Sequence, residues 1–174
     1  MVRISQNRVT QAFAAGDAAP TSHARGKALE DLLLYLFCKI PGVRLIRRNV
    51  LTGDGSEEID LVFWNDKSVL DFLPNVLLFE CKNWNGPVTS ASVSFFISKA
   101  VARHLPHAFL IAAQGLTGDA DQLNHAHAHL HNALTVNDCK IVILTRADLV
   151  SLSDTKQLVT LIIDRISELY LLGV

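Results

Sequence analysis

Apolar residues recur along the first half of the chain with two different spacings. From about residue 22 to residue 40 they return every three or four positions, which predicts a helix with one buried face, and Pro41-Gly42 ends it. The segments 43–51 and 58–64 have the length and composition of strands. The turn residues TGDGSE between them predict an antiparallel hairpin. A third strand, VLLFECK, follows at 76–82.

The second half of the chain alternates helices with strands. A helix is expected after Gly86-Pro87, with an inner stripe that ends at His104, and another over about 119–134. The strands 108–113 and 140–145 follow these two helices, and a last helix begins near Asp154. This order predicts an α/β fold of the restriction-endonuclease type, with a mixed sheet of about five strands flanked by helices (αβββαβ, then αβα).

Two segments fit this order less well. Residues 1–21 are mixed and rich in alanine, with Gly16 and Pro20 interrupting any pattern, so an N-terminal arm or a short helix is expected there. The stretch 65–75 is long for a hairpin connection, and SVLDFL within it is a candidate for a short extra element. We therefore expect an arm at 1–21 and one domain at 22–174.

The third strand ends in two charges. Side chains alternate faces along a strand, so Glu80 and Lys82 point one way, whereas Phe79 and Cys81 point the other. Removing a lone carboxylate from water costs several kcal/mol, of the order of the whole stability of a small domain. A positive partner must therefore lie beside Glu80.

A second carboxylate suggests what that partner is. Asp60 shares a face with Val62 and Trp64 on segment 58–64, and antiparallel pairing with 76–82 can bring it beside Glu80. Two close carboxylates repel each other unless a cation lies between them, and oxygen ligands suit Mg²⁺ or Mn²⁺. The sequence thus predicts a metal held by Asp60, Glu80 and the backbone carbonyl of Cys81.

Two further residues complete this predicted site. Lys82 could orient a water molecule, accept its proton if the lysine pKa is lowered, or stabilise a charged phosphorane-like state. Glu30 lies at the edge of the first helix's apolar stripe and can reach inward, while Asp31 faces solvent. Gly26, one turn earlier, would let the helix approach the sheet closely.

These motifs resemble a known family. GKALE at 26–30, EID at 58–60 and ECK at 80–82 resemble the PD-(D/E)xK nuclease superfamily. ECKNWNG, AFLIAAQGLTGDA and IVILTRADLVSL resemble, more narrowly, Mrr-like restriction endonuclease catalytic domains. The resemblance implies metal ligation by Asp60 and Glu80, water activation by Lys82 and support of the metal by Glu30. Ile59 stands where the family usually has proline.

Composition limits the possible functions. The 174 residues are 49% hydrophobic, enough for one buried core. Three widely spaced cysteines argue against a disulfide framework or a cysteine zinc site, and neither a membrane span nor a signal peptide is evident, so a cytoplasmic protein is expected. The net charge of -1 gives no general attraction to nucleic acid. If the negative charges of Glu30, Asp60 and Glu80 are assigned to a metal, the rest of the chain carries a net charge of +2 and need not repel a phosphate backbone.

Several polar side chains are candidates for DNA contact, although exposed charges usually only solvate a surface. They are Arg47, Arg48, Asn83, Trp84, Lys99, Arg103 and Gln114. The histidines at 125, 127, 129 and 131 pair at metal-ligand spacing on a helix, but beyond Asp121 no acid or cysteine completes a zinc set. A partly exposed histidine-rich helix is the favoured interpretation of that cluster.

The sequence therefore predicts a metal-dependent endonuclease that hydrolyses phosphodiester bonds in DNA. The resemblance implies 5′-phosphate and 3′-hydroxyl products and a role in restriction of foreign or modified DNA. Residues 1–22 are too few for a recognition domain, so specificity is expected from a homodimer or a separate recognition subunit. Two alternatives stay open: a Holliday-junction resolvase, and a catalytically silent nucleic-acid-binding subunit of the same fold.

Overall fold

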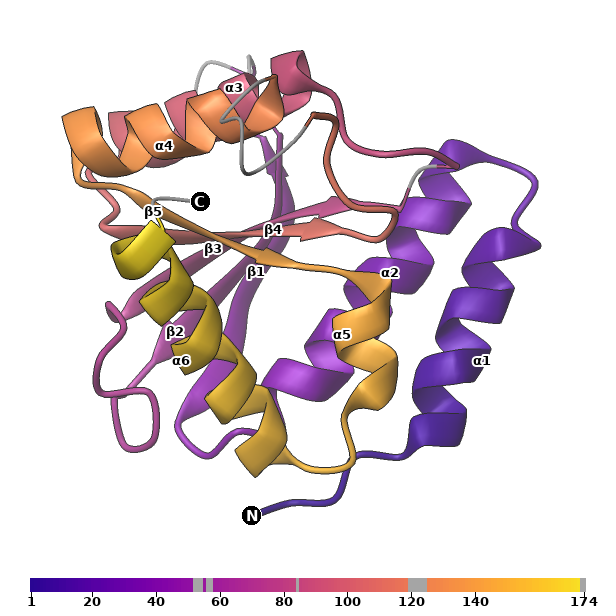
Figure 1. Ribbon diagram of the computed structural model, residues 1–174. Helices are drawn as coiled ribbons and strands as arrows, with labels where there is room; N and C mark the ends of the chain where they lie inside the picture. Colours follow the sequence, from indigo (N-terminus) through magenta and orange to yellow (C-terminus); the bar gives the residue numbers. More distant parts are fainter. Residues whose placement is uncertain (52–54, 56–57, 84, 119–124, 173–174) are drawn as a thin grey trace.

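The strand segments assemble into a single mixed sheet. A computed structural model describes residues 1–51, 55, 58–83, 85–118 and 125–172 (Figure 1). Strands β1, β2 and β3 are mutually antiparallel, whereas β3, β4 and β5 are parallel, and the order across the sheet is β1-β2-β3-β4-β5. The predicted α/β architecture is confirmed. The strands are β1 Val43–Leu51, β2 Glu58–Asn65, β3 Val76–Lys82, β4 His107–Ala112 and β5 Lys140–Leu144.

Helices cover both faces of this sheet. Figure 1 shows α3 and α4 on one face and α2, α5 and α6 on the other, with α1 lying outside α2. No helix among the described residues is both long enough and apolar enough to cross a membrane. The helices are α1 Gln6–Asp17, α2 Ser22–Phe37, α3 Ser90–Ala102, α4 Ala126–Asn137, α5 Arg146–Ser151 and α6 Thr155–Leu172.

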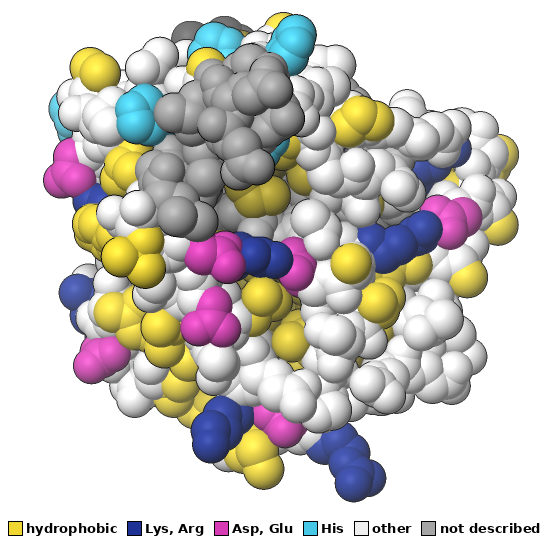
Figure 2. All heavy atoms as spheres, in the orientation of Figure 1, with side chains coloured by type: hydrophobic (Ala, Val, Ile, Leu, Met, Phe, Trp, Pro, Cys, Tyr) yellow, Lys and Arg dark blue, Asp and Glu magenta, His cyan; other side chains and the backbone are white. Residues whose placement is uncertain are grey.

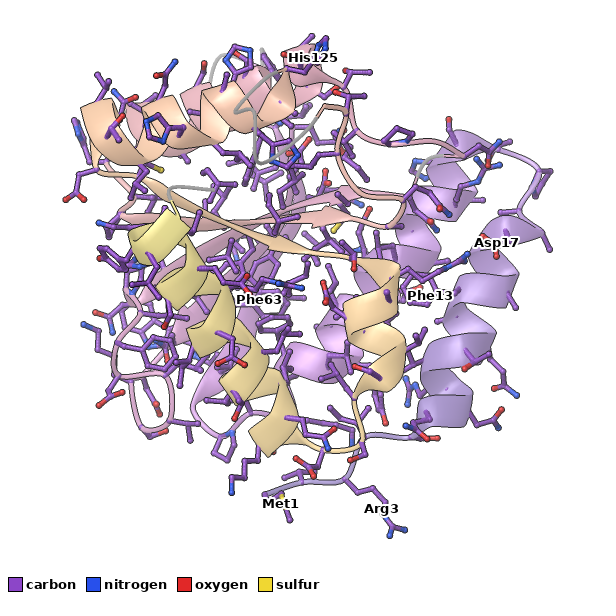
Figure 3. The ribbon with its side chains drawn as sticks, in the orientation of Figure 1. Met1, Arg3, Phe13, Asp17, Phe63 and His125 are labelled. Atoms are coloured by element: carbon purple, nitrogen blue, oxygen red, sulfur yellow. The ribbon has the colours of Figure 1, made fainter. Side chains whose placement is uncertain are left out.

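Each face of the sheet has its own hydrophobic core. On the α2 side, Phe37 and Phe63 pack with Phe79, which stacks on Phe109 at 4.5 Å between ring centroids (Phe63 is labelled in Figure 3). On the α3 side, Leu78 belongs to a second buried cluster. Burial on both faces explains why β3 is apolar without alternation until Glu80.

The N-terminal segment is a helix that belongs to the main core. Ser5 caps α1 by accepting a hydrogen bond from the backbone of Arg8, and Val9 and Phe13, one turn apart, are buried. Phe13 and Asp17 lie on the side of α1 that faces α5, where Arg146 contacts both (Figure 3). Residues 6–17 therefore form the short helix that was one of the two expectations for this segment, and its buried residues belong to the main core.

Other local predictions need correction. Residues 66–75 form turns rather than a helix or strand, and they are held because Asn65 donates to the carbonyl of Leu70 and because Leu70 and Leu73 are fully buried. Helix α3 ends at Ala102, so His104 is exposed and outside its inner stripe. Helix α4 extends to Asn137, and residues 119–124 lie outside the described part of the chain.

Candidate active site

The pairing of β2 with β3 brings the predicted acids together. Leu61 pairs with Phe79, so Asp60 and Glu80 are the next residues along the two strands. The backbone N–H of Cys81 donates to Oδ2 of Asp60 at 2.6 Å. The carbonyl of Cys81 leaves the strand on the same side as its N–H, toward β2. The predicted juxtaposition of Asp60, Glu80 and Cys81 therefore has a geometric basis.

The strand does not keep a strict alternation around Asp60. Ile59 packs in the core under α3, whereas Leu61 packs in the core under α2. The predicted placement of Asp60 on one face with Val62 and Trp64 assumed a strict alternation that this strand does not keep. This break in alternation lets Asp60 turn toward the backbone of β3 instead of into a core.

A polar cleft of about 350 Å³ opens at this end of β2 and β3. It is bounded by the first turns of α2, by β1 and by the strand ends. A Cβ placed on Gly26 would meet only Oε1 of Glu30, at 4.0 Å. The prediction that this glycine is needed for close packing of the helix on the sheet is therefore wrong. The lining residues are Ser22, His23, Gly26, Glu30, Asn49, Glu58, Asp60, Cys81, Lys82 and Asn83.

Two lysines compensate the buried charge of Glu80. The Glu80 side chain is only 5% exposed, and its Oε1 lies 2.8 Å from Nζ of Lys82. Its Oε2 lies 2.9 Å from Nζ of Lys99, which reaches the sheet from α3. Lys82 was predicted as a residue of this site, whereas Lys99 was predicted only as a candidate DNA contact. Its position one turn after Phe96, at the edge of the apolar stripe of α3, is the signal that could have shown it to be buried.

The charged form of the Asp60 carboxyl group is disfavoured in this structure. Burial, followed by the charge of Glu80, raises the pKa of Asp60 to about 7, although the Cys81 hydrogen bond and Lys82 act in the opposite direction. Among the described residues, Glu30 and Glu80 have cationic partners at ion-pair distance and Asp60 has none. A cation placed beside Asp60 would therefore stabilise the charged form of this carboxyl group.

Lys82 is an ammonium in this arrangement. Burial alone lowers the pKa of Lys82, but the charge and hydrogen bond of Glu80 outweigh burial, so the pKa is raised above its ordinary value. A general base at neutral pH needs a lowered lysine pKa. Of the roles predicted for Lys82, proton abstraction is not supported, because the pKa of Lys82 is raised and not lowered. Stabilisation of negative charge is consistent with the raised pKa.

Glu30 reaches the cleft from α2, as predicted, and binds an arginine there. Its Oε2 accepts from Nε of Arg48 at 2.6 Å, and the same guanidinium lies 2.6 Å from the exposed Asp31. Arg48 was predicted as a DNA contact. Because its guanidinium is engaged by two carboxylates, its observed role is to hold Glu30 beside the cleft.

The other predicted DNA contacts are scattered. Asn83 lines the cleft but is buried, and it donates to the backbone carbonyl of Arg25. Lys99 is buried against Glu80, which does not suit a direct phosphate contact. Arg47 and Gln114 are exposed, Arg103 is partly buried and donates to the carbonyl of Lys99, and Trp84 lies outside the described residues. On the face shown in Figure 2, basic and acidic side chains are interspersed.

Comparison with known families agrees with this fold and site. The family model described as a restriction endonuclease, the Mrr catalytic domain, matches residues 22–161. The chain belongs to this restriction endonuclease family. The match begins at the first residue of α2 and includes Glu30, Asp60, Glu80 and Lys82. No curated protein matches the chain significantly.

Membership of this family implies a divalent metal, and the donor set fits one. Carboxylate oxygens and a backbone carbonyl are the ligands that Mg²⁺ and Mn²⁺ prefer, and the raised pKa of Asp60 marks a place where a cation would be favoured. Among the described residues, no three His, Cys, Asp or Glu side chains, the four α4-region histidines included, already converge on one point. Glu80 and Glu30 are instead held by lysine and arginine.

Proposed function

We propose that this restriction endonuclease family member is a metal-dependent DNA endonuclease. One observation carries the proposal: Asp60, a half-buried carboxyl group bound by the Cys81 N–H, and the ammonium of Lys82 line the same polar cleft, with Glu80 bonded to that ammonium. A nuclease needs a negative group to hold a metal and a positive group to face the phosphate. The cleft offers both within one hydrogen-bonded network.

The residues divide the work of phosphodiester hydrolysis. A divalent ion held by Asp60, Glu80 and the Cys81 carbonyl would supply Lewis-acid polarisation of the phosphate and a more acidic water. The Cys81 N–H orients Asp60 by binding its Oδ2. The ammonium of Lys82 stabilises the negative charge that grows on phosphate oxygens as the water attacks. Glu30, fixed by Arg48, lines the same cleft and supports the site from its outer side.

We infer a wider role from the same family. Restriction of foreign or modified DNA in the cytoplasm suits an Mrr-type nuclease domain, with 5′-phosphate and 3′-hydroxyl products. A second copy of the chain, or a separate recognition subunit, would supply specificity and allow both strands to be cut. Arg47 and Gln114, both exposed, are the predicted DNA contacts that stay available for this role.

A nicking assay tests the proposal. Supercoiled plasmid is incubated with the wild type and with Lys82→Ala, with Mg²⁺ or Mn²⁺ and, separately, with EDTA. Loss of the charge-stabilising ammonium is expected to slow nicking about 10²- to 10³-fold, and EDTA is expected to abolish it. Lys140→Ala, which removes a buried lysine far along the sheet in β5, is the control for folding and purity.

The outcomes separate the candidate functions. Equal nicking by the wild type and Lys82→Ala would assign the activity to a contaminant, and no nicking by the folded wild type would favour the silent subunit. A synthetic four-way junction assayed beside its linear duplex arms distinguishes the resolvase, because a resolvase would cut the junction much faster. We expect similar rates on both substrates.

A further inference from the structure

The two carboxylate oxygens of Glu80 have different partners. Oε1 is bound by Lys82, the residue two positions ahead on the same strand, and Oε2 is bound by Lys99 on α3. The distances are nearly equal, 2.8 and 2.9 Å. The surroundings of the two ammonium groups are not equal, and this difference has consequences for the site.

Lys99 is a permanently enclosed partner. Its side chain is 4% exposed, and Nζ donates to the backbone carbonyl of Glu58 at 2.7 Å as well as to Glu80. The ring of Phe95 covers it at 4.9 Å, and Arg103 fixes the Lys99 backbone by donating to its carbonyl. A buried ammonium that leaves its two acceptors would lose hydrogen bonds that water does not replace, so Lys99 is expected to stay in place.

Lys82 is an exchangeable partner. Its side chain is 23% exposed and lines the cleft together with Asp60. An ammonium in this position can leave Glu80 for water, for Asp60 or for a phosphate without becoming a buried unpaired charge. Oε1 of Glu80 is thus the oxygen on the cleft side, and Oε2 is the oxygen on the core side.

We propose that Lys99 is a positioning residue that holds Oε2 of Glu80 throughout, so that Oε1 can pass from Lys82 to a cation entering the cleft. This inference rests on the proposed function, because it concerns how the same site takes its metal. A cation held in the cleft would take the place of Lys82 beside Oε1, and the ammonium of Lys82 would then be available to the phosphate. Lys99 keeps the buried carboxylate in one orientation during the exchange.

Nuclear magnetic resonance of the lysine side chains tests the exchange without turnover. The wild-type chain carries ¹⁵N and ¹³C in its lysines, is titrated with Mg²⁺ alone, and its Nζ and Cε signals are followed. Lys82→Arg and Lys99→Arg each remove one signal and so assign the two. Because the titration itself uses the wild type, the result does not depend on whether a variant is stable.

The two lysines are expected to respond differently. In the metal-free protein the Lys99 ammonium protons should exchange slowly with water, and Mg²⁺ should leave this signal in place while the Lys82 signal shifts by a large amount. Loss of the Lys99 signal on adding Mg²⁺, or equal shifts of both signals, would overturn the proposal. No shift in any lysine signal up to millimolar Mg²⁺ would count against the proposed metal site as a whole.

Variants then test whether Lys99 acts through Glu80. Lys99→Met should lower kcat for nicking about tenfold or more and leave KM for DNA nearly unchanged, whereas Lys140→Met should alter neither. In a Glu80→Gln background, Lys99→Met should have no further effect on kcat. Lys99→Gln, which keeps a neutral donor, replaces Lys99→Met if that variant does not fold. Equal effects of the Lys99 substitution with and without Glu80 would contradict a positioning role.

Discussion

Two buried lysines of this protein look alike in isolation and differ in their partners. The side chain of Lys99 is 4% exposed and that of Lys140 is 7% exposed, and each binds an aspartate or glutamate carboxylate. The partner of Lys140 is Asp138, two residues earlier in the chain and 86% exposed. The partner of Lys99 is Glu80, on another element and 5% exposed. One pair therefore lies at the surface, and the other lies inside.

The two pairs differ in the burial of the carboxylate far more than in the burial of the lysine. Asp138 keeps its hydration, so Lys140 can satisfy its own ammonium at little cost. Glu80 has lost its hydration and depends on its two lysines. A buried acid beside a cleft is a candidate for ligand binding, and here the cleft also contains Asp60.

The largest expected effect on stability comes from replacing Lys99, and the matching substitution of Lys140 is its comparison. Lys99→Met leaves a buried carboxylate with one partner fewer, so the free energy of unfolding should fall by about 3 kcal/mol. Lys140→Met leaves only a hydrated aspartate, and the loss should be below about 1 kcal/mol. Urea unfolding of both variants without metal makes the comparison. Equal losses would show that the two lysines are equivalent after all.

The next effect concerns the pH dependence that Asp60 brings to the site. The folded pKa of about 7 exceeds the ordinary value of 3.8, so between these pH values folded Asp60 holds a proton that the unfolded chain has lost. The contribution of Asp60 to the free energy of unfolding should be fully present below about pH 4. It should be lost as the pH rises to 7, by about 2 kcal/mol after allowance for partial exposure.

Asp60→Asn tests this sign. The variant should lose the fall in stability between pH 4 and 7 and should be more stable than the wild type at pH 8 in EDTA. Urea unfolding at a series of pH values gives the measurement. A wild type whose stability rises over this range, with Asp60→Asn behaving identically, would contradict the raised pKa of Asp60.

The smallest effect belongs to an exposed pair. Arg146 binds Asp17 at 2.7 Å, but the Asp17 side chain is 54% exposed. Asp17→Asn should therefore lower the free energy of unfolding by about 0.5 kcal/mol, and this loss should vanish in 1 M salt. Thermal melts at low and high salt check it. A loss as large as that of Lys99→Met would mean that burial does not rank the ion pairs of this protein.

The part of the site on adjacent strands could be predicted, because strand geometry acts locally. Once 58–64 and 76–82 pair antiparallel, only a few registers are possible, and these place Asp60 near Glu80. The contacts of Lys99 and Arg48 could not be found in the same way. They depend on how α3 and α2 are set against the sheet, and the sequence pattern fixes only which stripe of a helix faces inward.

Local signals explain most of the remaining differences in the fold. Helix α5 is short, but Thr145 and Asp148 form a capping box that the sequence contains and that would have predicted its start. Helix α1 has few apolar residues, and its stability comes from the docking of Val9 and Phe13 into a core made elsewhere in the chain. Such tertiary docking has no local sequence signature.

Calorimetric titration of Mn²⁺ into the protein tests the central claim, that Asp60 and Glu80 hold a divalent ion in the cleft. The wild type is predicted to bind Mn²⁺ and to release protons near pH 6.5, because Asp60 must ionise to bind it. Asp60→Asn is predicted to bind at least about tenfold more weakly without proton release, and Asp17→Asn to bind as the wild type does. Undiminished binding by Asp60→Asn, or none by the wild type, would contradict the claim.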